Sequence, residues 1–254
     1  MRIIFSRKGF DSGSGGGSSP IVDGAPVSLP IPDSKGVART TYGDLGLGAL
    51  ADAASRGAFG ADSLCHHDPM FTTDAEGQGR CIFGQVGAAQ THLANHGVGR
   101  GDVFVFFGRF EGEGQAPHHR IFGYLEVEQV IDLTACNEAV RREYAALGHP
   151  HALGMHGSND TLYVGPGRVA STASDALRLT APGEALSRWV RPRWLRRGDL
   201  SYHDAEWRWA ERDRLIAVSR GQEFVADIGR RKAPREWLKD VTAAIRRSPS
   251  SNCD

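Results

Sequence analysis

The chain has 254 residues, enough for one substantial hydrophobic core, so we expect a single domain over residues 1–247 and a disordered Ser-rich tail at 248–254. Its 30 Lys and Arg balance its 30 Asp and Glu, so no net field attracts nucleic acid, and composition alone neither favours nor excludes that partner. Four cysteines without Cys-x-x-Cys spacing argue against a zinc ribbon or disulfide scaffold, and no signal peptide or membrane span is evident, so we expect a cytoplasmic protein without a membrane partner.

The N-terminal segment predicts a short strand and then a loop suited to an anion. Residues 2–6 (RIIFS) are β-branched and aromatic, which favours a buried strand. The cationic residues Arg7 and Lys8 follow directly, and the glycines after them let backbone N–H groups approach a phosphate. No Walker A ending is present, and a flexible Gly/Ser turn is the alternative. The residues predicted to bind phosphate or nucleotide here are Arg7, Lys8, Asp11, Ser12, Gly15 and Gly16.

Residues 20–97 carry weaker signals. Prolines favour an irregular, extended stretch over residues 20–42, with a hairpin at Asp23-Gly24. Residues 44–54 are a weak helix candidate, and residues 60–82 have the composition of a loop. A short helix is predicted over residues 87–97 and is closed by Gly97, because glycine readily adopts the left-handed cap.

The clearest pattern is a pair of apolar runs at residues 101–110 and 120–131. Both are rich in β-branched and aromatic residues and are joined by a polar loop, so they are predicted to pair antiparallel. A helix at 137–148, a strand at 161–164 and an amphipathic helix at 234–247 follow. This order predicts an α+β fold with a mixed, largely antiparallel sheet and flanking helices.

The strand pair carries a Gly-Asp turn, an aromatic strand end and the run IFGYLEVEQV at residues 121–130. Over about residues 99–133 it is similar to the PUA-like superfamily, which includes the PUA, ASCH and EVE domains. The similarity implies a barrel-like core whose pocket recognises a nucleobase, often a modified one. Such a pocket needs aromatic faces for stacking, with ordinary core packing as the alternative. The candidates are Phe106, Phe107, Phe110 and Tyr124.

Five motifs are spread along most of the chain: FSRKGFDS at residues 5–12, HHDP at 66–69, FGQ at 83–85, GAAQTHL at 87–93 and GQEFV at 221–225. With them the chain resembles a bacterial family called nucleotide modification associated domain, type three. The resemblance implies a place in systems that hypermodify DNA bases or handle their precursor nucleotides, with other components of such a system as partners. It implies no particular reaction and no catalytic residue.

All ten histidines fall between His66 and His203. His92 and His96, at i and i+4 on the predicted helix, could share a metal with His66 or Asp68, but the Glu of His-Glu-x-x-His is missing. We therefore assign no metal ligand and name no cofactor from the sequence. Histidines and a carboxylate beside apolar residues suit acid–base chemistry. The catalytic candidates are His66, Asp68, His92 and Glu223, and Gln85 and Gln90 are amides suited to a base edge or ribose.

Three functions remain open. The first is an enzyme acting on a nucleotide or nucleobase, which the scattered polar motifs favour. The second is a non-catalytic reader of a modified base in DNA, and the third is a structural subunit of a modification or defence complex. The enzyme requires the N-terminal loop, the segment at 66–68 and the segment at 85–92 to meet in one cleft.

Overall fold

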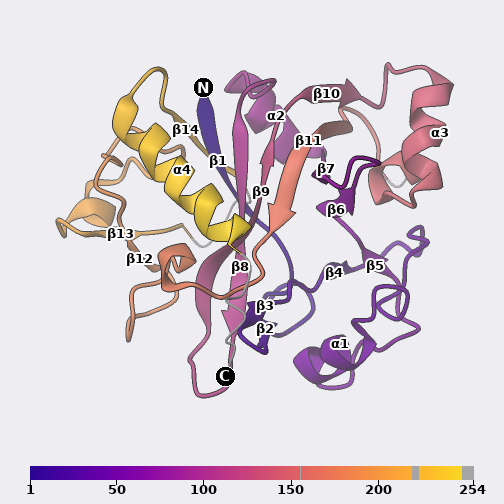
Figure 1. Cartoon of the computed structure of the whole chain (residues 1–254), viewed down its shortest axis with the longest axis horizontal. Coiled ribbons are helices and arrows are strands. Elements are labelled where there is room, and N and C mark those ends of the chain that lie inside the picture. The colour runs from indigo at the N-terminus through magenta and orange to yellow at the C-terminus, as the bar shows by residue number, and fades with distance from the viewer. Residues whose placement is uncertain (155, 219–222, 248–254) are drawn as a thin grey trace.

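The computed structural model describes residues 1–154, 156–218 and 223–247. Its centre is a ten-stranded, mostly antiparallel sheet (Figure 1). The main strand order is β14 (Glu223–Asp227), β1 (Arg2–Arg7), β8 (Val103–Glu111), β9 (His118–Glu126), β11 (Thr161–Val169), β7 (Gly79–Gln85) and β6 (Met70–Thr73). Off this path, β10 (Gln129–Asp132) pairs with β11, β2 (Ser19–Val22) pairs with β8, and β3 (Ala25–Pro26) pairs with β2.

Helices and two small strand pairs surround this sheet. The α-helices are α1 (Gly48–Ser55), α2 (Gly87–Asn95), α3 (Glu138–Ala146) and α4 (Lys232–Arg246). The 3-10 turns are η1 (Pro150–Leu153), η2 (Asp175–Leu177) and η3 (Glu206–Trp209), and the small pairs are β4 (Ile31–Pro32) with β5 (Cys65–His66) and β12 (Arg188–Val190) with β13 (Arg214–Ile216). Within the described ranges, no helix combines the length and apolar character needed to cross a membrane.

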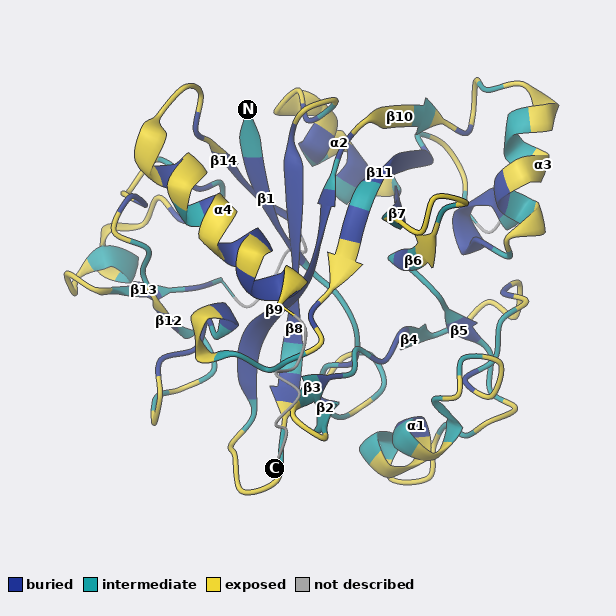
Figure 2. Ribbon diagram, in the orientation of Figure 1, coloured by how far each residue is buried: buried dark blue, intermediate teal, exposed yellow. Residues whose placement is uncertain are grey.

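The central strands are buried on both faces, as the dark strands of Figure 2 show. Side chains alternate along a strand, so Ile3 and Phe5 of β1 pack in one core with Leu238 of α4, while Ile4 packs in a second core with Leu93 of α2. An uninterrupted apolar run is what a strand covered on both sides requires. The α+β class with a largely antiparallel sheet and flanking helices is confirmed.

The loop after β1 leaves the sheet because β8 takes a second partner. The strand β1 runs parallel to β8 as far as Arg7 opposite Phe107, and the Lys8 N–H still donates to the Phe107 carbonyl at 2.8 Å. Beyond that point β2 occupies the same edge, with Ser19 opposite Phe110. The chain between must therefore project away from the sheet, and Gly9 makes the turn with φ at 82°.

Several local predictions agree with the structure. The hairpin at Asp23-Gly24 joins β2 to β3, with positive φ at both residues. Helix α2 is followed by Gly97 at a φ of 63°, and α4 presents its apolar stripe to the sheet. The predicted strand pair exists as β8 and β9, but the second run breaks after Glu126, and its last residues form β10 beside β11.

Two other expectations are wrong. The segment predicted as loop at 60–82 contains β6 and most of β7; these two strands pair with each other, and β7 also pairs with β11. Among the described residues the strand path has two ends and closes into no barrel, so the PUA-like core is not found. The four aromatic residues proposed as stacking faces are at most 2% exposed and lie in the hydrophobic cores: Phe106, Phe107, Phe110 and Tyr124.

Candidate functional site

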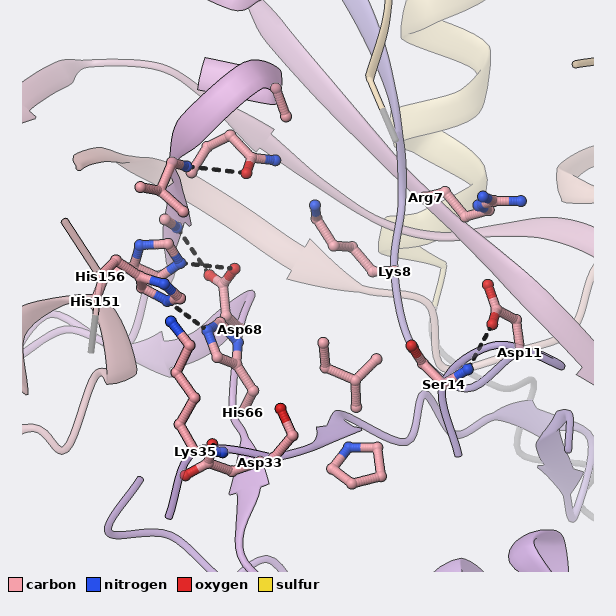
Figure 3. A pocket seen from close by; sticks show the side chains of 18 residues that line it. Arg7, Lys8, Asp11, Ser14, Asp33, Lys35, His66, Asp68, His151 and His156 are labelled. Carbon is pink, nitrogen blue, oxygen red and sulfur yellow. Dashed lines mark hydrogen bonds and ion pairs between the residues drawn. The ribbon is translucent and has the colours of Figure 1, made fainter. Parts of the chain in front are cut away.

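A cavity of about 460 Å³ opens where β1 separates from the sheet (Figure 3). It is bordered by segments that are distant in sequence: the stretch after β1, β4 and the turn that follows, β5 and Asp68, the junction of β7 and α2, and η1 with the chain beyond it. The polar residues lining it are Arg7, Lys8, Asp11, Ser14, Asp33, Ser34, Lys35, His66, Asp68, Gln85, His151 and His156. The three predicted segments therefore contribute to one cavity.

One wall holds a histidine cluster, which we define as His66, His151 and His156. Pairing of β4 with β5 places His66 opposite Ile31, and η1 carries His151. The Nε2 atoms of His66 and His156 are 3.3 Å apart, and one nitrogen from each of the three rings lies within 4.8 Å of the others. His151 Nδ1 is 2.5 Å from Asp160 Oδ1, and both side chains are buried. Because a carboxylate can only accept, His151 donates from Nδ1.

Asp68 lies beside this cluster in a buried position. Its Oδ1 accepts the Gly84 N–H at 2.8 Å and is 3.4 Å from His149 Nε2, while Oδ2 is 3.9 Å from His151 Nε2. Burial by itself raises the pKa of this carboxyl, but the interaction with His149 and the neighbouring imidazoles outweighs it and holds the pKa well below its usual range. Asp68 is therefore an anion at neutral pH.

Two histidines of the cluster are neutral at pH 7. Burial lowers the pKa of His66 to about 4, against the opposing charge of Asp68, and burial also lowers the pKa of His156 to about 4. Positive charge on one ring would in addition repel charge on its neighbours in the cluster. Each neutral ring keeps one nitrogen lone pair, which can accept a proton or bind a ligand.

The opposite wall contains a buried ion pair. Lys8 Nζ is 2.9 Å from Glu223 Oε1 and lies 4.3 Å from the centre of the Phe83 ring. The same Oε1 accepts hydrogen bonds from Ser6 Oγ at 3.1 Å and Gln85 Nε2 at 2.7 Å, whereas Oε2 is buried and has no hydrogen-bond partner among the described residues. Glu223, predicted as a catalytic carboxylate, therefore does not line the cavity itself, but it contacts Lys8 and Gln85, which do.

The glycine loop is organised differently from the predicted phosphate cradle. Arg7 and Lys8 point to opposite sides of β1 (Figure 3), so only Lys8 projects towards the histidine side. Asp11 Oδ1 accepts the N–H groups of residues 13 and 14 at 2.7 and 2.9 Å, which occupies donors that a phosphate would need. Ser12, Gly15 and Gly16 do not line the cavity. The two glycines have φ of 87° and 81°, a left-handed backbone conformation that favours glycine over residues with a side chain.

Two predicted residues of α2 face elsewhere. His92 Nε2 is 3.1 Å from Ser201 Oγ, and its ring stacks on Tyr202 at a centroid distance of 4.4 Å. Gln90 is buried and its Oε1 accepts the Tyr163 hydroxyl at 3.1 Å. The possible metal grouping of His92 with His66 or Asp68 is therefore not formed.

Sequence reasoning overlooked part of the cavity. The missed lining residues include Asp33, Lys35, His151 and His156, and Asp160 behind the lining was missed as the partner of His151. One signal was present: the stretch 149–156 (HPHALGMH) contains three histidines in eight residues. Such local density is a compositional indication of a polar or metal site.

Comparison with protein families identifies one relationship. A model described as nucleotide modification associated domain 3 matches residues 2–227, which include every residue of the cavity. Comparisons with curated proteins and with solved structures give no match. The family's description connects it with nucleotide modification. On a match over most of its length, the chain belongs to the nucleotide modification associated domain 3 family.

Proposed function

We propose that the protein is an enzyme of a DNA or nucleotide base-modification system and acts on a nucleotide or nucleobase bound in this cavity. The observation that carries the proposal is convergence. Lys8, His66, Asp68, Gln85 and His151 come from four segments and border one space, with cations and acid–base groups on facing walls. A hydrophobic core does not require that arrangement, whereas a reaction site does.

The size and charge of the cavity suit such a ligand. About 460 Å³ falls within the roughly 300–1,000 Å³ of small-molecule sites. Lys8 and, on the rim, Lys35 provide positive charge for a phosphate, and Figure 3 shows Lys35 extending beside His66. Gln85 presents a side-chain amide held by Glu223 and by the Val86 N–H.

We assign proton transfer to the wall that holds the histidine cluster. His66 is neutral and borders the cavity, so its imidazole can take a proton from a bound substrate. The adjacent Asp68 anion stabilises the imidazolium that forms. Glu223 acts through Lys8 and Gln85 as a positioning residue, because both donate hydrogen bonds to its Oε1.

The experiment is a two-part screen with purified protein. Nucleoside mono- and triphosphates, free nucleobases and short DNA duplexes are first tested for binding by calorimetry, and the same mixtures are analysed by mass spectrometry for conversion. The variant His66→Asn should keep binding within a few-fold and lose about 100-fold or more of turnover. The control His96→Gln changes an exposed histidine outside the cavity and should alter neither quantity.

Other outcomes point to the other functions. Binding of a modified base in DNA without conversion would favour a reader, although the aromatic side chains first considered for stacking are packed in the cores. No binding and no conversion would favour a structural subunit. Mass spectrometry of DNA and nucleotide pools from cells with and without the protein then identifies the pathway chemistry.

A further inference from the structure

We infer that the histidine cluster is a binding site for one divalent transition-metal ion, with Zn²⁺ as the reference ion, coordinated by His66, His151 and His156. The inference concerns the same cavity as the proposed function, but it rests on the geometry of the imidazoles and does not depend on which nucleotide binds there.

The distances between the ring nitrogens fit a single ion. Two imidazole nitrogens on one tetrahedral zinc, each about 2.0–2.1 Å from the ion, are about 3.4 Å apart. His66 Nε2 and His156 Nε2 are 3.3 Å apart. The set of three lies within 4.8 Å, so ion binding has to draw the third nitrogen inwards by roughly an ångström, which a small ring rotation provides.

His151 is held in the tautomer that a metal ligand needs. Its Nδ1 donates to the buried Asp160 carboxylate at 2.5 Å, so the lone pair of the neutral ring is on Nε2, the nitrogen 3.9 Å from Asp68. A histidine that binds a metal through one nitrogen commonly donates from the other to a carboxylate, which fixes the ring and raises its basicity. Asp160 is therefore the positioning residue of the site.

Carboxylates near the cluster supply the negative charge that an ion needs. A divalent cation bound by imidazole rings in a buried setting needs nearby negative charge. Asp68 is in contact distance of the cluster, and Asp160 is hydrogen-bonded to it, so two carboxylates balance the ion. Both carboxylate side chains are 5% exposed, and each lies within 4 Å of a histidine ring nitrogen.

The cluster is accessible from the cavity. All three histidines line the cavity, so an ion held by three protein ligands keeps a position open to the bound molecule. Three protein ligands with one open position are typical of reactive rather than structural zinc sites. An ion in that position would bind water and lower its pKa; because His66 is then a ligand, this water rather than the His66 imidazole would take part in proton transfer.

The test uses the full-length protein after dialysis against a chelator. Isothermal titration with ZnCl₂ should give one tight site per chain, and CoCl₂ should give the visible absorption of a tetrahedral nitrogen-ligated Co²⁺ ion. His156→Gln removes a ligand and should weaken zinc binding by more than about 100-fold. Asp160→Asn keeps all three ligands and should weaken it by about 10- to 100-fold.

A second site has to be controlled for. The pair His92 and His96, with ring centroids 4.5 Å apart, is the competing place for loosely held zinc. The double variant His92→Gln/His96→Gln should keep the tight site unchanged. Thermal unfolding without metal identifies any variant that fails to fold, and the zinc-induced rise in unfolding temperature is then compared among folded variants.

Several results would overturn the inference. Wild-type protein without a tight site, or with a site unaffected by His156→Gln and Asp160→Asn, would leave the 3.3 Å contact as a simple N–H···N hydrogen bond. Nucleotide binding is titrated separately on the metal-free protein. If nucleotides bind but zinc does not, the metal site is refuted and the proposed function stands. If zinc binds but no nucleotide or base does, the metal site stands and the proposed substrate class is refuted.

Discussion

The ion pair between Lys8 and Glu223 offers a stability test that needs no ligand. The variant Lys8→Met keeps an apolar stem of similar length and removes only the cation. Glu223 is 1% exposed and the Lys8 side chain 10% exposed, so the carboxylate would stay buried without its charged partner. Breaking one side of a buried ion pair costs about 3–5 kcal/mol.

The contacts place the expected loss at the lower end of that range. Ser6 and Gln85 still donate to Glu223 Oε1, which offsets part of the missing charge, while the contact of the ammonium with the Phe83 ring is also lost. We expect Lys8→Met to lower the free energy of unfolding by about 3 kcal/mol. For a chain of this length that is a fall of roughly 6–12 °C in the unfolding temperature.

Urea unfolding followed by tryptophan fluorescence measures the loss. The matched control is Lys232→Met, because Lys232 is 89% exposed and its ion pair with Glu236 spans 3.6 Å, so a change under about 0.5 kcal/mol is expected. Adding Glu223→Gln to Lys8→Met should restore part of the stability by removing the unpaired charge. A loss below about 1 kcal/mol for the single variant, or no recovery in the double variant, would refute the reasoning.

Two further predictions concern stability. Burial lowers the pKa of His119 to about 3 and that of His203 to about 4. Both side chains are therefore neutral in the folded protein near neutral pH, whereas in the unfolded chain they bind protons below about pH 6.5. The free energy of unfolding should be at its full value above pH 6.5 and should fall on acidification towards pH 4, by up to about 1.4 kcal/mol per pH unit for each histidine. Urea midpoints at pH 7, 6 and 5 check this, and His203→Gln should flatten the slope; equal midpoints would contradict it. A Cβ on Gly84 would lie 2.2 Å from the His151 ring, so Gly84→Ala should lower stability by about 1–3 kcal/mol and reduce the zinc-induced rise in unfolding temperature, whereas Gly60→Ala, which enters open space, should do neither.

The sequence by itself determined the elements whose signal is local. The apolar run of β8 predicts a buried strand because alternate residues must meet apolar neighbours on both faces. Asp23-Gly24 predicts its hairpin and Gly97 ends α2, since each depends on the φ that one or two residues can adopt. The stripe of α4 predicts a helix because its period of 3.6 residues is contained in one segment.

The strands β6 and β7 could not be predicted in the same way. The apolar run of β7 covers only residues 81–83, between Arg80 and Gly84, so its own residues carry a weak strand signal. It is ordered by pairing with β11, which begins more than seventy residues later in the chain. Stabilisation by a distant partner leaves little trace in local composition.

The candidate site was partly predictable for a related reason. The sequence identified residue types with suitable chemistry, and the cavity includes Lys8, His66, Asp68 and Gln85. The sequence does not show that His92 lies outside the cavity, because the packing of α2 against the sheet determines which side of the helix faces the cavity.

Tertiary structure alone decided the partners within the site. The alternation of side chains along β1 sends Arg7 and Lys8 in opposite directions, and Lys8 meets Glu223 only because β14 pairs with β1 across the whole length of the chain. The histidine cluster likewise forms where β5 and η1 approach each other. Reactive groups separated by about a hundred residues or more are brought together by the packing of the elements that carry them, and no local pattern encodes that distance.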